Sequence, residues 1–280
     1  MFNFSLHPAH PFLKPFVRAY AIMELDYTDA LINTFMPKTE SVLLFHIGIP
    51  TASVLIDFTF PNSPQKHYAF QNHQGWLGGM LTEPLKGEIA PKGCYLCVTL
   101  TPTGLYHLLK ETATVLTNQG FSLDCLGLPC TFADLKEKLY VADSKTQALQ
   151  LVESELLTYY RALDIPFSVK DMSPVTNYIL RRKGIVKVKD LENKFHISGR
   201  WLQKQFSDQI GISPKEYARL TRFAAMLSYI KTTPSVILPT LLDEFGYYDQ
   251  SHLTKDFHQF TAQTPNAFLK THADILNDIF

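Results

Sequence analysis

Polar side chains that hydrogen-bond to nucleobases recur on one face of a predicted helix near residue 200. Arg200, Gln203, Lys204 and Ser207 fall within an arc of about 100° when each residue advances the helix by about 100°. In a major groove, Arg or Lys donates to guanine, and Gln makes two hydrogen bonds to adenine. This face contains no carboxylate. Its chemistry is therefore suited to base edges and phosphates.

The same pattern returns 51 residues later, without a gap. Leu202 recurs as Leu253 and Phe206 as Phe257, so each copy keeps an apolar core face. The second polar face consists of Gln250, Ser251, Thr254 and Lys255. Ser198 and Asp249 open the two copies and are good N-cap residues, whose helix N-termini can offer amide groups to phosphates. A single polar face is ordinarily a solvated helix surface, but its repetition favours a binding role.

The formal charge is divided unevenly along the 280 residues. Residues 1–167 hold 11 Lys and Arg against 15 Asp and Glu, whereas residues 168–272 hold 15 against 9. A basic C-terminal region beside an acidic remainder is a mild indication of a polyanionic partner. The repeat lies within this basic region.

The elements around the repeat are predicted to be helices with short turns. Ser213, Pro214 and Glu216 form a capping box with proline at the first helical position, which predicts a helix start. Apolar residues around much of its circumference indicate that this helix is buried between the two repeat units. The predicted helices span 175–182, 187–195, 198–210, 213–231, 236–245, 249–260 and 265–272.

The N-terminal region has the pattern of an all-β barrel followed by helices. Short apolar segments at 42–45, 54–60, 76–81 and 94–100 alternate with prolines and are predicted strands. Helices are predicted at 105–109, 132–139 and 147–163. The last has an apolar stripe that either packs on its own barrel or forms a dimer seam. Residues 164–173 are the predicted linker.

Bulk properties exclude several protein classes. Apolar residues make up 46% of the chain, no apolar run reaches 18 residues, and the N-terminus lacks a secretory signal pattern. Four cysteines without an export signal indicate a reducing compartment, so a cytoplasmic location is expected. Cys94, Cys97, Cys125 and Cys130 are read as buried thiols, with a zinc site or a redox sensor as alternatives. The histidines at 46, 67, 73 and 107 are scattered singly, and His7 and His10 flank a predicted surface turn. No metal site or cofactor is therefore expected.

Residues 171–272 resemble the DNA-binding domain of AraC/XylS family transcription regulators. The resemblance rests on S-G-R-W-L-Q-K-Q-F, on G-I-S-P-K-E-Y-A-R-L-T-R-F and on F-G-Y-Y-D-Q-S-H-L-T-K-D-F-H-Q-F-T-A-Q-T-P-N-A-F. It implies two helix-turn-helix units joined by a linker helix, with both recognition helices in successive major grooves of double-stranded DNA. Residues 1–165 resemble the cupin-like N-terminal domain of one subgroup, through W-L-G-G-M-L-T-E-P and C-V-T-L-T-P-T-G-L. The predicted fold class is α+β.

The function implied is that of a non-enzymatic, sequence-specific transcription regulator. A small-molecule effector, RNA polymerase and a second copy of the chain are candidate partners; a membrane is not. Two alternatives stay open: an alkylation-repair protein with a zinc-bound cysteine, and a DNA-binding protein whose N-terminal domain only dimerises. Arg219 and Arg222 on the linker helix are candidates either for phosphate contact or for an internal ion pair.

The sequence departs from the family pattern in both units, and mostly in the second. Glu192 and Leu242 stand where a small residue is usual, and Ala262 stands where glycine is usual. Pro239 lies in the first helix of the second unit, where it is tolerated only in the first turn. The second unit is therefore expected to differ in packing and to contribute backbone affinity more than base recognition.

Overall fold

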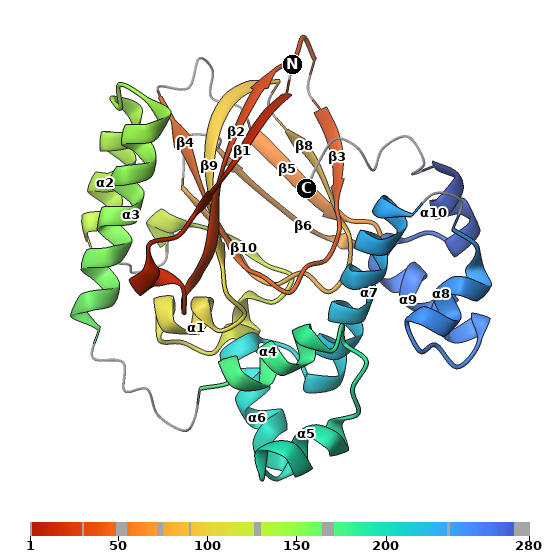
Figure 1. The fold of residues 1–280 in the computed structure, drawn as a ribbon. Helices are drawn as coiled ribbons and strands as arrows, with labels where there is room; N and C mark the ends of the chain where they lie inside the picture. The colour runs from red at the N-terminus through yellow and green to blue at the C-terminus, as the bar shows by residue number, and fades with distance from the viewer. Residues whose placement is uncertain are drawn as a thin grey trace.

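The computed structural model describes residues 2–29, 31–48, 55–71, 75–89, 91–125, 130–163, 171–233 and 236–271. Figure 1 shows a strand-rich N-terminal part with helices α2 and α3 along one side and the C-terminal helices α4 to α10 below and beside it. Part of the predicted linker, residues 164–170, and His73 lie outside the described residues.

The N-terminal part is built from two antiparallel sheets. The larger sheet has the order β1-β2-β9-β4-β7-β10, and the smaller has the order β3-β8-β5-β6. The strands are β1 Phe2–Pro8, β2 Val17–Asp26, β3 Leu31–Phe35, β4 Val42–Ile47, β5 Leu55–Phe60, β6 Ser63–Gln71, β7 Trp76–Gly78, β8 Leu85–Ile89, β9 Lys92–Leu100 and β10 Gly120–Ser122. The predicted β-rich domain is confirmed, and strands occur at all four predicted positions.

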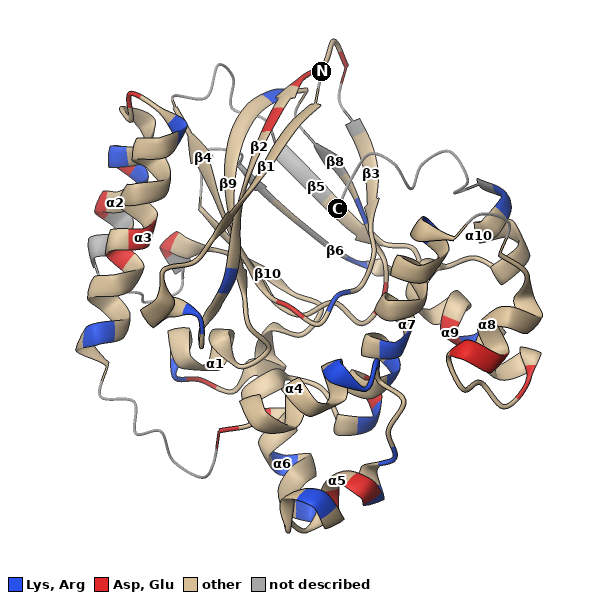
Figure 2. Ribbon diagram, viewed as in Figure 1, with Lys and Arg blue, Asp and Glu red and all other residues tan. Residues whose placement is uncertain are grey.

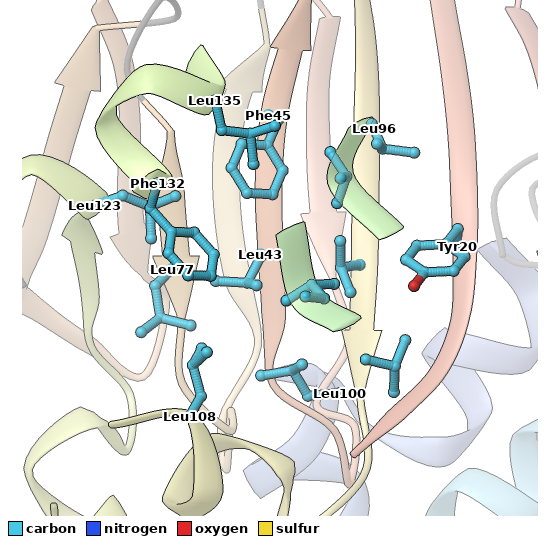
Figure 3. Packing of buried hydrophobic residues seen from close by; sticks show 14 of the residues in the cluster. Tyr20, Leu43, Phe45, Leu77, Leu96, Leu100, Leu108, Leu123, Phe132 and Leu135 are labelled. Carbon is cyan, nitrogen blue, oxygen red and sulfur yellow. The ribbon is translucent and has the colours of Figure 1, made fainter. Parts of the chain in front are cut away.

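Alternation along the strands divides apolar side chains between two cores. Leu43 and Phe45 of β4 point towards the helices on the outer face, together with Leu96 of β9 (Figure 3). Between the sheets, Phe58 and Trp76 stack with ring centroids 5.8 Å apart. The larger sheet is thus apolar on both faces, as the nearly continuous apolar strand segments predicted.

Helix α3 packs over the larger sheet, which decides between the two alternatives for its apolar stripe. The helices of this part are α1 Gly104–Leu109, α2 Cys130–Tyr140 and α3 Lys145–Ala162, with short 3-10 turns η1 Pro11–Leu13, η2 Ala113–Leu116 and η3 Leu123–Cys125. Val152, Leu156 and Tyr160 of α3 are at most 1% exposed in the outer core. The apolar stripe packs on its own sheet, so the prediction of a dimer seam along this stripe is wrong.

The described cysteine and histidine side chains form no metal-binding group. Cys94 is partly buried and Cys97 fully buried; since they are three residues apart on β9, they point to opposite faces. Burial raises the pKa of both thiols, that of Cys97 to about 11. Among the residues that the structure describes, no three His, Cys, Asp or Glu side chains gather at one point. The side chains of Cys125, Cys130 and His67 lie outside that description.

The C-terminal part is entirely helical in its described residues. Its helices are α4 Ser173–Arg181, α5 Val188–Phe195, α6 Gly199–Ile210, α7 Pro214–Thr232, α8 Leu238–Glu244, α9 Gln250–Thr261 and α10 Pro265–Thr271. All seven predicted helices occur, with boundaries shifted by at most two residues. Aromatic and aliphatic residues from all seven share one core, which also takes in Met80 of the N-terminal part. No described helix is long and apolar enough to cross a membrane.

Candidate nucleic-acid interface

The first recognition helix, α6, is defined at both ends by local chemistry. The Ser198 hydroxyl accepts a hydrogen bond from the Trp201 amide at 3.3 Å, as an N-cap should. Leu202 and Phe206 are fully buried and fix which side faces the core. Gly211 ends the helix with a φ of +92°, a conformation that a side chain would strain.

The opposite side of α6 exposes three of the four predicted contact residues. Arg200, Gln203 and Lys204 are all exposed. The Lys204 ammonium pairs with Asp208 one turn later, so a carboxylate adjoins this face after all. A solvent-exposed pair of this kind contributes little stability, and a phosphate can displace it.

Ser207 is engaged elsewhere. The Thr114 hydroxyl donates to the Ser207 carbonyl oxygen at 2.6 Å, and the two hydroxyls lie 3.1 Å apart. Thr114 belongs to η2 of the N-terminal part. The structure therefore separates Ser207 from the exposed face formed by Arg200, Gln203 and Lys204.

The second recognition helix, α9, has the same design. Asp249 accepts from the His252 amide at 2.7 Å, and the core side contains Leu253, Phe257 and Phe260, all fully buried. Gln250, Ser251 and Lys255 are exposed, whereas Thr254 is partly buried. Both predicted helix caps thus form, and six of the eight predicted contact residues lie on exposed faces.

The two units differ in charge. Residues 171–213 contain eight Lys and Arg and four Asp and Glu, whereas residues 236–271 contain two and four. Figure 2 shows Lys and Arg on α5 and α6, while α8 is marked by acidic residues. Asp243, Glu244 and Asp249 are exposed on the second unit. Only the first unit therefore has the positive surface that attracts a phosphate backbone.

The linker-helix arginines make an internal ion cluster. Asp256 of α9 is 0% exposed and accepts from Arg219 Nε at 3.1 Å and from Arg222 Nη2 at 3.2 Å. The Tyr247 hydroxyl also donates to this carboxylate, at 3.0 Å. Of the two roles left open, the internal ion pair is the one that the structure shows. The cluster attaches the second unit to α7.

Sequence reasoning missed Asp256, although a signal was present. Asp256 lies three residues after Leu253 and four before Phe260, and therefore on the apolar side of α9. A carboxylate at such a position requires a buried cation, because an isolated buried charge is strongly unfavourable. Arg219 and Arg222, on the neighbouring helix, were the obvious candidates.

The departures from the family pattern are accommodated locally. Gly199 gives room to Glu192, since a β-carbon at 199 would lie 2.7 Å from the Glu192 carboxylate. Pro239 falls in the first turn of α8, where proline is tolerated. Leu242 packs against the helical core. Ala262 has a φ of +59°, so the chain adopts a left-handed conformation there without glycine.

A second group of charged residues lies where the strand-rich N-terminal part meets α7. Lys38 is exposed at its surface, yet desolvation lowers its pKa. Cys97 opposes this shift, while the charges of Lys231 and Arg18 add to it. Burial also lowers the pKa of Lys231. Arg18 pairs with Glu40. The charges of Arg18 on β2 and Lys231 on α7 therefore both act on Lys38, in the β3–β4 loop.

These features define a DNA-binding transcription regulator with two helix-turn-helix units. Residues 191–271 match the family model described as a helix-turn-helix domain. The match covers both helix-turn-helix units that the sequence motifs predicted.

Solved structures with similarity along the chain include ToxT from Vibrio cholerae. One has 11% identity and a TM-score of 0.46, over 96% of this chain and 98% of that chain. Another, bound to (E)-4-(8-methylnaphthalen-1-yl)but-3-enoic acid, has 10% identity and a TM-score of 0.47, with the same coverage. The AraC-like transcriptional activator CuxR has 14% identity and a TM-score of 0.28, over 80% and 86% of the two chains. No curated protein matches the chain.

Proposed function

We propose that this protein recognises a specific DNA sequence mainly through α6. The observation that carries this proposal is the exposed set of Arg200, Gln203 and Lys204 on a capped helix, in the unit with excess positive charge. Base recognition by a helix-turn-helix uses the N-terminal residues of the second helix, which is where these side chains lie. Ser198 places the α6 N-terminus where its amides can bind a phosphate.

The second unit would bind the adjacent major groove with lower affinity. The linker helix α7 has 19 residues and is about 28 Å long, comparable with the roughly 34 Å between successive major grooves. Gln250, Ser251 and Lys255 are the groups available there, with Asp249 at the helix N-terminus. The exposed carboxylates of this unit repel phosphate, so its contribution to affinity is the smaller one.

The test is selection of binding sites from random DNA by the full chain. The proposal is supported if the selected sequences share a motif and if the protein protects one strong and one weak half-site of it in footprinting. Arg200→Ala should then lower affinity for the strong half-site, while Lys215→Ala, an exposed change at the start of α7, should leave it unchanged. Equal affinity for all sequences would refute sequence-specific recognition.

We further propose that an organic anion regulates the protein by binding near Lys38 and Lys231. Desolvation and the charges of Lys231 and Arg18 disfavour the charged form of Lys38, with Cys97 opposing them, and a bound carboxylate would favour the charged form. Because Lys38 belongs to the barrel and Lys231 to the linker helix, one anion contacting both would change how the two parts are held together.

A matched pair of ligands tests this second proposal. A medium-chain fatty acid should raise the melting temperature and change DNA affinity, whereas the alcohol of equal chain length should do neither. Lys38→Met and Lys231→Met should each abolish the effect of the acid, and Lys215→Met should preserve it. Equal responses to acid and alcohol would rule out a carboxylate site at these lysines.

A further inference from the structure

The N-terminal part holds the same turn of both recognition helices. Thr114 Oγ1 donates to the carbonyl oxygen of Ser207 in α6 at 2.6 Å. Asn62 Nδ2 donates to the carbonyl oxygen of His258 in α9 at 3.1 Å, and to that of Gln259 at 3.0 Å. Ser207 and His258 are 51 residues apart, which is the offset of the internal repeat. Equivalent positions of two similar units are therefore bound by two unrelated segments of the N-terminal part.

Close packing reinforces the attachment of the first unit. Thr117 Oγ1 donates to the carbonyl oxygen of Gly211 at 3.0 Å. A β-carbon at Gly211 would lie 2.4 Å from Thr117 Oγ1 and 2.9 Å from the carbonyl oxygen of Ala113. The η2 segment thus fits directly against the C-terminal end of α6, with no room for a side chain between them.

The two attachments are joined to each other. Asn118 Nδ2 donates to Thr82 Oγ1 at 2.8 Å, and the Thr82 amide donates to Asn118 Oδ1 at 2.7 Å. We call residues 79–83 and 113–118, which these bonds connect, the platform. Met80 of the platform is 2% exposed within the core of the helical part. The Ser63 hydroxyl, next to Asn62, donates to Glu83 at 3.0 Å, which ties the Asn62 turn to the same platform.

We propose that the platform sets the relative placement of the two recognition helices, with Thr114 and Asn62 as the positioning residues. This inference rests on the proposed DNA-binding function. The platform, with the Asn62 turn bound to it, contacts the C-terminal halves of α6 and α9, whereas Arg200, Gln203 and Gln250 nearer the N-terminal ends stay exposed. The spacing between the two DNA half-sites is therefore fixed by the N-terminal part as well as by α7. The same inference gives a role to the W-L-G-G-M-L-T-E-P segment, residues 76–84, which supplies half of the platform.

The experiment measures how DNA affinity depends on half-site spacing. The full chain is titrated with its selected site and with sites in which one base pair is added or removed between the half-sites, a change of about 3.4 Å. The wild type should prefer the selected spacing at least tenfold. Because one hydrogen bond accounts for about fivefold in an equilibrium constant, the double variant Thr114→Val and Asn62→Ala should reduce this preference to about twofold or less. Its affinity for an isolated half-site should stay within about twofold of wild type.

Matched variants separate positioning from general stability. Thr112→Val with Gln65→Ala changes exposed residues of the same two segments and should keep the wild-type spacing preference. Asn118→Gly should act like the double variant, because glycine tolerates the φ of +54° at this position while losing both bonds to Thr82. Thr114→Ser, with Asn62 unchanged, keeps a hydroxyl at position 114 and should therefore retain the wild-type spacing preference.

Several outcomes would overturn the inference. A wild type indifferent to spacing, a double variant with unchanged spacing preference, or equal losses on isolated half-sites would each do so. A wild type that selects no DNA sequence would instead refute the proposed function itself. Since isolated half-sites and paired half-sites are measured separately, the two failures can be told apart.

Discussion

Replacing Asp256 by Asn is expected to destabilise the helical part by about 3–5 kcal/mol, the usual cost of breaking a buried ion pair from one side. Asp256 is fully buried, and its two oxygens have different partners. Oδ1 accepts from Arg219, while Oδ2 accepts from Arg222 and from the Tyr247 hydroxyl. An asparagine amide turned either way therefore directs its NH2 group at a guanidinium donor.

The magnitude depends on which arginine is left without a counter-charge. The Arg222 side chain is 11% exposed and lies 4.0 Å over the Tyr247 ring, so water can do little to solvate it. The Arg219 side chain is 26% exposed and keeps Gln259 as an acceptor at 2.8 Å, so its loss is smaller. Most of the cost should therefore come from Arg222. Since a domain is stable by only about 5–15 kcal/mol, this is a large fraction of the total.

Urea denaturation of the full chain, followed by circular dichroism at a helix wavelength, measures the effect. Asp243→Asn is the matched control, because it makes the same chemical change at an exposed position of the same unit. The control should shift the free energy of unfolding by less than about 0.5 kcal/mol. A loss below about 1 kcal/mol in Asp256→Asn would show that the arginines are well solvated, and would refute the role assigned to this cluster.

Three further changes have expected outcomes. Gln203→Ala should weaken binding to the selected DNA by about 1–3 kcal/mol and relax the preference at one base pair. Fluorescence anisotropy measures this effect, with Gln150→Ala as control. An equal loss of affinity for all DNA sequences would indicate a backbone contact instead. Ala262→Gly should raise the free energy of unfolding by roughly 0.5–1 kcal/mol, because alanine is strained at its φ of +59°. Gly211→Ala, at the equivalent position of the first unit, should lower it. Urea denaturation that gives changes of the opposite sign would contradict both predictions. Burial lowers the pKa of His107, with the charge of Asp171 opposing the shift, so the contribution of His107 to stability is fully present above about pH 6.5 and is lost as the pH falls below it. His107→Gln should therefore reduce the dependence of the melting temperature on pH in this range. An unchanged pH dependence in the variant would exclude His107 as the source of the loss.

The helical part could be predicted from sequence because its signals are local. Serine and aspartate caps, proline at a first turn and glycine at a helix end each act within a few residues. The repeat then supplied an internal check, since the same pattern appears twice. Even Pro239, which departs from the family pattern, lies in the first turn of α8, the part of a helix where proline is tolerated.

The barrel was predicted only in outline, because strand pairing depends on distant residues. β2 pairs with β9, which lies at the other end of the strand region in sequence, and no local pattern specifies this partner. The apolar stripe of α3 left two alternatives open for the same reason: its period shows that one face is buried but not what covers it. Thr114, Asn62 and Lys38 have no local signature at all, since their roles exist only after the two parts have packed together.

The two recognition helices are attached in physically different ways, and this bears on how regulation could operate. The first unit contacts η2 through threonine hydroxyls and a glycine-dependent fit, while its DNA-facing side is positively charged. The second unit is anchored to α7 through the buried Asp256 cluster and touches the N-terminal part through Asn62 and Gln259. Lys231, in the last turn of α7, is close enough to Lys38 of the N-terminal part for its charge to lower the Lys38 pKa. A ligand that draws Lys38 and Lys231 together would therefore act on the second unit through α7, while the first unit stays fixed to η2. Regulation by this route changes the spacing of the two helices rather than the chemistry of either one.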